Sequence, residues 1–347
     1  MPQISFIMPV YNTRTEWLKR AVNSVRKQTV EDWELLLIDD GSKAETARVC
    51  DELGDLDGRI RIFHQRNQGP SVARNCGMDN AEADWVAFID ADDWIVCDYA
   101  EQLLSVLEKY DLDVCAFGHA DIRGTKTVHQ LWEDEKVYIF REEEKEQIQL
   151  MLLSWPQVEK KYSMFFGAQW NMVYSRNFLD QFRIRNIPEL RKSEDAVFNL
   201  YVLEHAKKIA YYSRILYFYF INDESVTGSY NKDISRYLKL LSAYRDFLKK
   251  TGKSRVLKKA YLFNAMLQFE GSLSVYFFHR ENKDSREVKK ERMRYFLTEP
   301  PYQEILKGKV PSDFGIYKKW MFYFMKRKYY TGIYFLYILK RRLKKKK

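Results

Sequence analysis

The amino-acid sequence predicts an α/β protein with a mostly parallel sheet, helices on both faces and a basic helical region after it. In the first 120 residues, short apolar runs rich in β-branched and aromatic side chains alternate with amphipathic runs. The apolar runs are bounded by Gly, Asp or Asn, as buried parallel strands commonly are. From Lys232 onward the pattern is helical and basic.

The predicted elements of these 120 residues follow the order βαβαβαβαβ. The strands are expected at Ile4–Val10, Trp33–Ile38, Ile60–His64, Trp85–Ile89 and Val114–Gly118. The helices between them are expected at Thr15–Lys27, Ala44–Leu53, Ser71–Ala81 and Tyr99–Lys109. This alternation is typical of doubly wound sheets, in which ligands bind beyond the carboxyl ends of the strands.

The rest of the chain predicts a mixed region and then a helical one. The mixed region is expected to contain a hairpin-like stretch to Phe140, helices at Arg141–Ser154 and Ser193–His205, the segment Gly167–Tyr174 and a strand-rich run Ile209–Phe220. We place a boundary near residues 228–233. The predicted domains are therefore 1–231, divided into halves 1–120 and 121–231, and 232–347.

Composition and charge support a folded protein with two electrically different parts. The 347 residues are 46% hydrophobic and 16% aromatic, which excludes a disordered or low-complexity chain. The formal net charge is +10, but residues 232–347 carry 31 basic and 10 acidic side chains, against 27 and 38 in residues 1–231. Different partners are expected for the two parts.

The cysteines and the apolar runs indicate where in the cell the protein is expected to lie. Four widely spaced cysteines, Cys50, Cys76, Cys97 and Cys115, favour reduced core residues in a cytosolic protein. The N-terminus lacks the features of a secretory signal. The longest aromatic-aliphatic run, Tyr329–Leu339, has 11 residues, whereas a spanning helix needs about 20. We expect no conventional transmembrane segment.

Polar motifs follow three of the predicted strands. They are Pro9-Val10-Tyr11-Asn12, Asp39-Asp40-Gly41-Ser42 and Asp90-Ala91-Asp92-Asp93. Asp90 and Asp92 are two residues apart at a strand end, so both can converge on one cation, and oxygen-only ligation suits Mg²⁺ or Mn²⁺. The alternative is an acidic loop in which Asp92 or Asp93 caps the next helix. Glycine-rich phosphate loops are absent from the sequence.

These motifs, in this order, resemble family 2 inverting glycosyltransferases with a GT-A fold. The resemblance is carried by Pro9–Asn12, Ser24-Val25, Gln28-Thr29, Glu34–Ser42, Asn67–Gly77, Ala87–Trp94, Trp170-Asn171 and Ser193–Asp195. It extends to about Thr227, roughly two thirds of the chain. It implies a nucleotide-sugar-binding half at 1–120 and an acceptor half at 121–231.

The resemblance also implies roles for the strand-end residues. Pro9, Tyr11 and Asp40 are expected around a uracil-like ring, with Asp39 nearby and Val10 and Asn12 in the same loop. Tyr11 can stack on the ring while a carboxylate accepts its N3–H. Asp39 and Asp40 are also expected to form a turn with Gly41, and Ser42 to cap a helix.

Further roles fall on the basic and acidic residues that follow. Arg74 matches a basic group near base or phosphate, and its alternative is a surface salt bridge. In the Asp90-Ala91-Asp92 motif, Asp90 is expected to face the ribose and Asp92 to bind the metal on the diphosphate of a UDP-sugar.

Glu194 and Asp195 are the candidate catalytic residues. On local sequence alone, Ser193 capping a helix with acidic residues in its first turn is the simpler interpretation. In the family the second acid of this pair is the general base, and Asp195 matches it. A carboxylate there would deprotonate the acceptor hydroxyl in a single displacement that inverts the anomeric centre.

The sequence departs from the family pattern at several positions. Met172 replaces a frequent Lys, and Phe220-Ile221-Asn222 replaces an Arg-containing stretch, so sugar and acceptor specificity is not carried over. The histidines are scattered and are expected to be structural: His64, His119, His129, His205 and His279.

The C-terminal residues 318–347 hold 12 basic and no acidic side chains, next to ten aromatic residues in Tyr317–Tyr337. This predicts attachment to an anionic membrane surface, with a solvated tail or a packed helical cap as alternatives, and nucleic-acid binding is disfavoured. We expect a cytoplasmic, peripheral membrane enzyme that moves sugar from UDP-sugar to a glycan or lipid-linked glycan, with Mn²⁺ or Mg²⁺. A nucleotidyltransferase and a noncatalytic membrane or polyanion adaptor are the alternatives.

Overall fold

The computed structural model describes residues 1–347 except 124, 130–134, 155–165, 222–229, 253–254 and 346–347. The chain forms two compact units. Unit 1 contains residues 1–152 and 157–225, and unit 2 contains residues 153–156 and 226–347. The boundary predicted near 228–233 falls partly on residues outside the described ranges.

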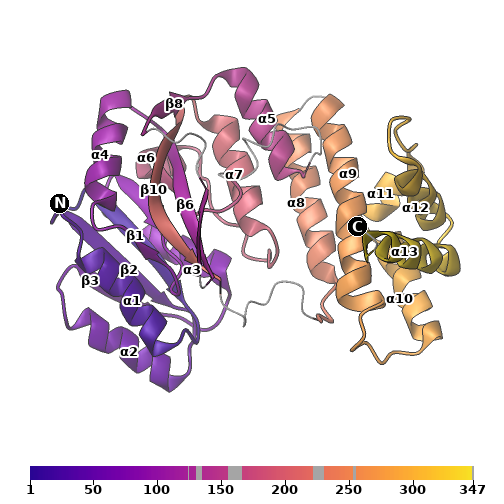
Figure 1. The fold of residues 1–347 in the computed structure, drawn as a ribbon, viewed down its shortest axis with the longest axis horizontal. Helices are drawn as coiled ribbons and strands as arrows, with labels where there is room; N and C mark the ends of the chain where they lie inside the picture. Colours follow the sequence, from indigo (N-terminus) through magenta and orange to yellow (C-terminus); the bar gives the residue numbers. More distant parts are fainter. Residues whose placement is uncertain (124, 130–134, 155–165, 222–229, 253–254, 346–347) are drawn as a thin grey trace. The chain divides into compact units, whose positions relative to one another are not determined.

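Unit 1 is built on one large mixed sheet (Figure 1). Its strands are β1 (Ile4–Val10), β2 (Trp33–Asp39), β3 (Ile60–His64), β4 (Trp85–Phe88), β5 (Trp94–Ile95), β6 (Val114–Arg123), β7 (Thr125–His129), β8 (Val137–Ile139), β9 (Met172–Ser175) and β10 (Ile209–Phe220). The order is β3-β2-β1-β4-β9-β6-β10-β5, with β7 paired to β6 and β8 to β10.

Helices cover both faces of this sheet. They are α1 (Thr15–Arg26), α2 (Ala44–Gly54), α3 (Pro70–Asn80), α4 (Tyr99–Tyr110), α5 (Glu142–Leu152), α6 (Arg176–Gln181) and α7 (Glu194–His205). Phe6 and Leu35 point to the face where α1, α2 and α4 bury their apolar stripes. On the other face, Gly77 lets α3 approach Ile7 of β1 closely. A Cβ at this position would lie only 2.3 Å from the Ile7 side chain.

The predicted α/β fold with helices on both faces is confirmed, but the sheet contains more antiparallel pairs than expected, through β5, β7, β8 and β9. Strands β1, β2, β3 and β4 pair in parallel, as expected. Between β4 and β6, however, lies β9, which is antiparallel to both. The prediction of reduced core cysteines is partly wrong, because Cys97 is exposed and Cys76 half-buried.

Unit 2 is helical in its described residues. Its helices are α8 (Ser235–Thr251), α9 (Arg255–Ser272), the π-helical turn η2 (Leu273–Phe277), α10 (Arg286–Thr298), α11 (Tyr302–Lys307), α12 (Ile316–Lys326) and α13 (Tyr330–Lys345). Aromatic side chains build its core, including the mutually packed Phe269, Phe296 and Tyr302. Within the described ranges, no helix combines the length and the apolar character needed to cross a bilayer.

Candidate active site

A buried guanidinium on α3 joins the ends of two distant elements. Arg74, whose side chain is 7% exposed, donates to Asp195 Oδ1 at 2.8 Å and to Asp90 Oδ1 at 3.2 Å. Its Nη1 also lies 3.7 Å from the Glu194 carboxylate. Asp90 follows β4, and the two other acids begin α7, so one cation holds the candidate ribose-side and base-side carboxylates together. The alternative of a surface salt bridge is right in that Arg74 pairs with acids, but its guanidinium is buried and not at the surface.

The charges in this cluster shift one another's proton affinities. Burial alone would lower the pKa of Arg74, but Asp195, Asp90 and Glu194 raise it instead, so the cation is permanent. Burial also raises the pKa of Asp195, to about 7, against the opposing effect of Arg74. A carboxyl group with such a pKa gains and loses its proton near neutral pH, which is the property a general base needs.

The acidic turn after β4 divides its three carboxylates between two tasks. Asp93 is fully buried, and its oxygens accept from the Tyr217 hydroxyl at 2.6 Å and the Phe220 amide at 2.7 Å. Burial and the neighbouring Asp90 and Asp92 hold the pKa of Asp93 well above its usual range. Asp93 is therefore a structural residue of the turn, while Asp90 and Asp92 are half-buried.

The alternative that Asp92 or Asp93 caps the next helix is wrong. The residues after the turn form β5, and α4 begins only at Tyr99, with Asp98 at its N-cap position. The turn is fixed from α1 instead. Arg20 donates to the Asp92 carbonyl oxygen at 2.6 Å, and its guanidinium lies over the Trp94 ring at 4.0 Å.

The loop after β2 is tied to a second loop by a buried carboxylate. Asp40 accepts from the Gln65 side chain at 2.7 Å and from the Gln68 and Gly69 amides at 2.8 and 2.7 Å. Gly41 has a φ of +72°, and a Cβ there would lie 2.6 Å from the Asn67 amide nitrogen. The predicted turn is therefore observed.

Asp39 is also engaged with the protein. It accepts from the Ser42 amide at 2.9 Å, and its second oxygen lies 2.8 Å from His64 Nδ1. Burial acts to raise the pKa of Asp39, but these hydrogen bonds leave it lowered. The hydrogen bonds of His64 with Asp39 and with Asp51 raise the pKa of His64. Capping by Ser42 is wrong, because Lys43 occupies the N-cap position of α2.

The loop after β1 divides into buried and exposed positions. Val10 is buried in the core, and Pro9 is half-buried. Asn12 links two loops, because its amide donates to Ser42 Oγ at 3.0 Å and its side chain accepts from the Lys43 amide at 2.8 Å. Tyr11 is 56% exposed, so its ring face is available for stacking.

Helix α7 begins without the side-chain cap that its sequence suggests. Ser193 stands at the N-cap position with a φ of 52° and accepts no capping hydrogen bond. A capping serine normally has an extended backbone, so this left-handed conformation explains the difference. Glu194 and Asp195 still occupy the first turn, where the helix dipole favours their negative charge.

The sequence did not predict two residues that support the acidic turn after β4. Tyr217 on β10 accepts from the Asp90 amide at 3.1 Å while it donates to Asp93, and Arg20 holds the same turn from α1. Tyr217 is one of several tyrosines in β10, and the sequence has no signal that separates it from the others. Its neighbour Trp170 stacks on it with ring centroids 4.6 Å apart.

Other predicted positions have simple locations. Ala91 is buried in the turn after β4, and Met172 is buried on β9. In the stretch 220–222, Phe220 packs against Trp17 and Trp94, whereas Asn222 lies outside the described residues.

The fold is that of a GT-A glycosyltransferase. The family model described as "Glycosyl transferase family 2" matches residues 5–182, about half of the chain. The chain belongs to this family. The sequence resemblance to family 2 is thereby confirmed.

Curated relatives support the same family. EpsH of Bacillus subtilis (strain 168), named as a glycosyltransferase, is 31% identical over 238 residues, which are 67% of this chain and 65% of EpsH. The glycosyltransferase GlyA of Streptococcus pneumoniae is 30% identical over 230 residues, which are 65% of this chain and 31% of GlyA. The match thus spans less than two thirds of either relative.

Solved structures share the fold over almost the whole chain. The crystal structure of S. aureus TarS 1-349 in complex with UDP-GlcNAc has a TM-score of 0.68 and 16% identity, and covers 98% of this chain and 92% of that one. At this identity the likeness concerns the fold.

Replacing Arg74 tests the central ion-pair cluster. Arg74→Met leaves three carboxylates without their cation, so we expect the free energy of unfolding at pH 8 to fall by about 3 kcal/mol. The loss should shrink at pH 5, because the pKa of Asp195 is about 7 and its protonation below that pH removes one of the unpaired negative charges. Urea unfolding at both pH values measures this.

The matched control is Arg185→Met. Arg185 also bridges two acids, Asp79 at 2.9 Å and Asp180 at 2.7 Å, but the side chains of these acids are 60% and 42% exposed. We expect a loss of about 1 kcal/mol or less. Equal losses for the two variants at pH 8 would contradict a central role for Arg74.

Proposed function

We propose that the protein is a metal-dependent inverting glycosyltransferase that moves a sugar from a UDP-sugar to a hydroxyl group of a glycan or lipid-linked glycan. The observation that carries the proposal is the Arg74 cluster. It places a carboxyl group with a pKa of about 7, Asp195, beside the acidic turn that would hold the donor diphosphate. Family membership favours this function over a nucleotidyltransferase or an adaptor.

Asp195 is the general base in this proposal, with Glu194 beside it. The ionised carboxylate takes the proton of the acceptor hydroxyl as that oxygen attacks the anomeric carbon. The bond from this carbon to the diphosphate breaks in the same step, and UDP leaves with the bonding electrons. Since there is one displacement, the anomeric configuration inverts. Arg74 keeps Asp195 at the site and favours its ionised form.

The donor is assigned to UDP-sugars by two arguments. Tyr11 is exposed beyond β1, next to the loops that Asp39 and Asp40 organise, and its ring suits stacking on a flat base. TarS, which shares the fold, has been solved with UDP and with UDP-GlcNAc. Unit 1, residues 1–152 and 157–225, would then be the catalytic unit.

The donor set of the acidic turn fits a hard divalent cation. Asp93 is occupied by Tyr217 and Phe220, so Asp92, with Asp90 beside it, is the group that suits Mg²⁺ or Mn²⁺. The remaining coordination positions suit diphosphate oxygens and water. When bound, the cation would neutralise charge on the departing UDP.

Thermal stability in the presence of ligand tests the donor site. We expect UDP with Mn²⁺ to raise the melting temperature more than UDP alone, because a bound cation would lower the Kd of UDP. Stabilisation grows with the ratio of ligand concentration to Kd and reaches about 2.7 kcal/mol at 100 times the Kd. Asp92→Asn should lose the Mn²⁺-dependent part of the shift. Asp84→Asn is the control, because Asp84 is exposed at the opposite end of β4. If UDP causes no shift in the unmodified protein, the proposal is wrong.

Kinetics of Asp195→Asn tests the base. We expect transfer to fall by about 100- to 10,000-fold while UDP binding is kept, because the amide cannot accept the proton. In the unmodified protein, kcat/KM should fall as the pH drops below about 7, where Asp195 becomes protonated. Glu194→Gln should retain more activity than Asp195→Asn. An acid limb near pH 4, or full turnover by Asp195→Asn, would remove Asp195 as the base.

Unit 2 is proposed to attach the enzyme to an anionic membrane surface, on the cytoplasmic side. Helix α12 buries Met321 and Met325 while exposing Ile316, Trp320 and Tyr323. Helix α13 likewise exposes an apolar set on its outer surface: Tyr334, Phe335, Leu339 and Leu343. The alternative of a packed helical cap describes the inner side of these helices but leaves the outer aromatic side without a function.

Charge on the same helices favours an anionic surface. Lys318 lies 3.9 Å from Glu270, and Lys340 pairs with the same acid, so these two cations are partly used within unit 2. Lys326, Arg341 and Arg342 are exposed. Apolar side chains beside exposed cations are the pattern of an interfacial helix.

Vesicle flotation tests the attachment. The protein should bind vesicles that contain phosphatidylglycerol and not those of phosphatidylcholine alone. Trp320→Ser/Phe335→Ser should weaken binding, as should Arg341→Gln/Arg342→Gln, because each basic group near the surface contributes about 1 kcal/mol. Leu56→Ser removes an exposed apolar side chain from unit 1 and should have no effect. Equal binding of all variants would contradict the assignment.

A further inference from the structure

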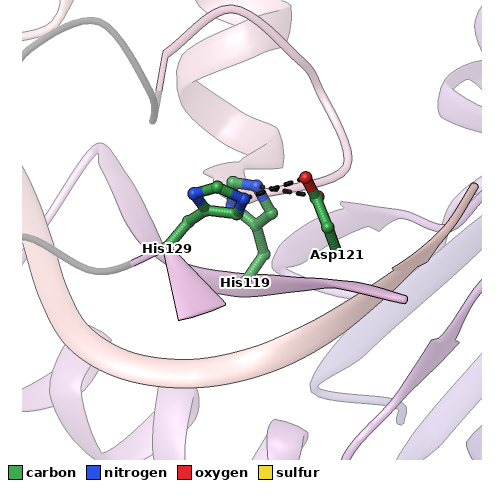
Figure 2. Close-up of side chains that lie close together, drawn as sticks. All are labelled: His119, Asp121 and His129. Carbon is green, nitrogen blue, oxygen red and sulfur yellow. Dashed lines mark hydrogen bonds and ion pairs between the residues drawn. The ribbon is translucent and has the colours of Figure 1, made fainter. Parts of the chain in front are cut away.

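Two histidines and a carboxylate meet on the hairpin formed by β6 and β7. His119 of β6 lies directly opposite His129 of β7, and Asp121 follows two residues after His119 on the same side of the strand. Asp121 Oδ2 lies 2.9 Å from His129 Nε2, and Oδ1 lies 3.7 Å from His119 Nε2 (Figure 2). The three potential ligand atoms all lie within 4.8 Å of one another.

We propose that His119, Asp121 and His129 bind a divalent first-row transition cation of the zinc type, at a site separate from the acidic turn after β4. Imidazole nitrogens and a carboxylate are ligands that Zn²⁺ prefers, whereas Mg²⁺ prefers oxygen alone. Zinc bonds of about 2.0–2.1 Å place tetrahedral ligands roughly 3.3 Å apart. One ligand atom from each of the three residues lies within 4.8 Å of the other two, so side-chain rotations that shorten the longer separations would close the site.

The surroundings hold one ligand in place. His119 is 7% exposed, and Trp170 packs edge-on against it with ring centroids 4.8 Å apart. Trp170 in turn stacks on Tyr217 and Tyr219. The side chains of Asp121 and His129 are more accessible, at 28% and 20% exposed.

The proposed cation would fasten β7 to β6 and fix the position of Trp170. Three protein ligands leave one coordination position for water or another ligand. None of its three proposed ligands belongs to the acidic turn that contains Asp90 and Asp92. Trp170 stacks on Tyr217, and Tyr217 donates to Asp93 of that turn, so a chain of contacts connects the two sites. The proposal replaces the structural role that the sequence suggested for these two histidines.

Zinc binding by the full chain tests the proposal without measuring transferase activity. The protein is stripped with EDTA, desalted and titrated with Zn²⁺ in competition with a chromophoric chelator. We expect one Zn²⁺ per chain at this site and a loss of affinity of about tenfold or more in His129→Gln and Asp121→Asn. Both positions are partly exposed, so these variants should fold.

Two controls locate the cation. His205→Gln removes a histidine that stacks on Phe182 and should leave zinc binding unchanged, as should Asp92→Asn. Zn²⁺ should also raise the melting temperature of the unmodified protein but not of His129→Gln. If His129→Gln binds Zn²⁺ as tightly as the unmodified protein, or if the loss occurs in His64→Gln instead, the proposal is overturned.

Discussion

The arrangement of the candidate active site depends on one buried cation, the guanidinium of Arg74. Arg74 comes from α3, and its partners come from the end of β4 and the start of α7, more than 100 residues later in the sequence for Asp195. A buried guanidinium requires compensating charge, and buried carboxylates require the same. Neither α7 nor the turn after β4 can therefore move away without leaving charge unpaired. The same requirement brings a carboxyl group with a raised pKa to the edge of the sheet where ligands of such folds bind.

Carboxylates at the other strand ends are divided between support and recognition. Asp40 and Asp93 are buried and accept hydrogen bonds through both oxygens, so they shape the loops that surround the site. Asp90 and Asp92 are more accessible and can face a ligand. Aspartates that are adjacent in the sequence thus differ in role. The buried carboxylates support the loops, and the more accessible ones can face a ligand.

The sequence predicted what depends on local patterns. The strands and helices of the first 120 residues lie within a few positions of the expected ones, because alternation and helical spacing are properties of short segments. The insertion of β9 between β4 and β6 could not be predicted in this way, since it depends on pairing between residues about 60–90 positions apart. The same holds for Tyr217 below the acidic turn and for His119 opposite His129, which become neighbours only through strand register.

The charge asymmetry of the chain follows from these requirements. In the proposed function, a site that holds a metal cation and a base needs several carboxylates near one another, and Arg74 and backbone amides compensate their repulsion locally in unit 1. For the proposed membrane attachment, the basic residues of unit 2 would supply the attraction to anionic lipid. The net charge of +10 is therefore the sum of an acidic part, residues 1–231, and a basic part, residues 232–347.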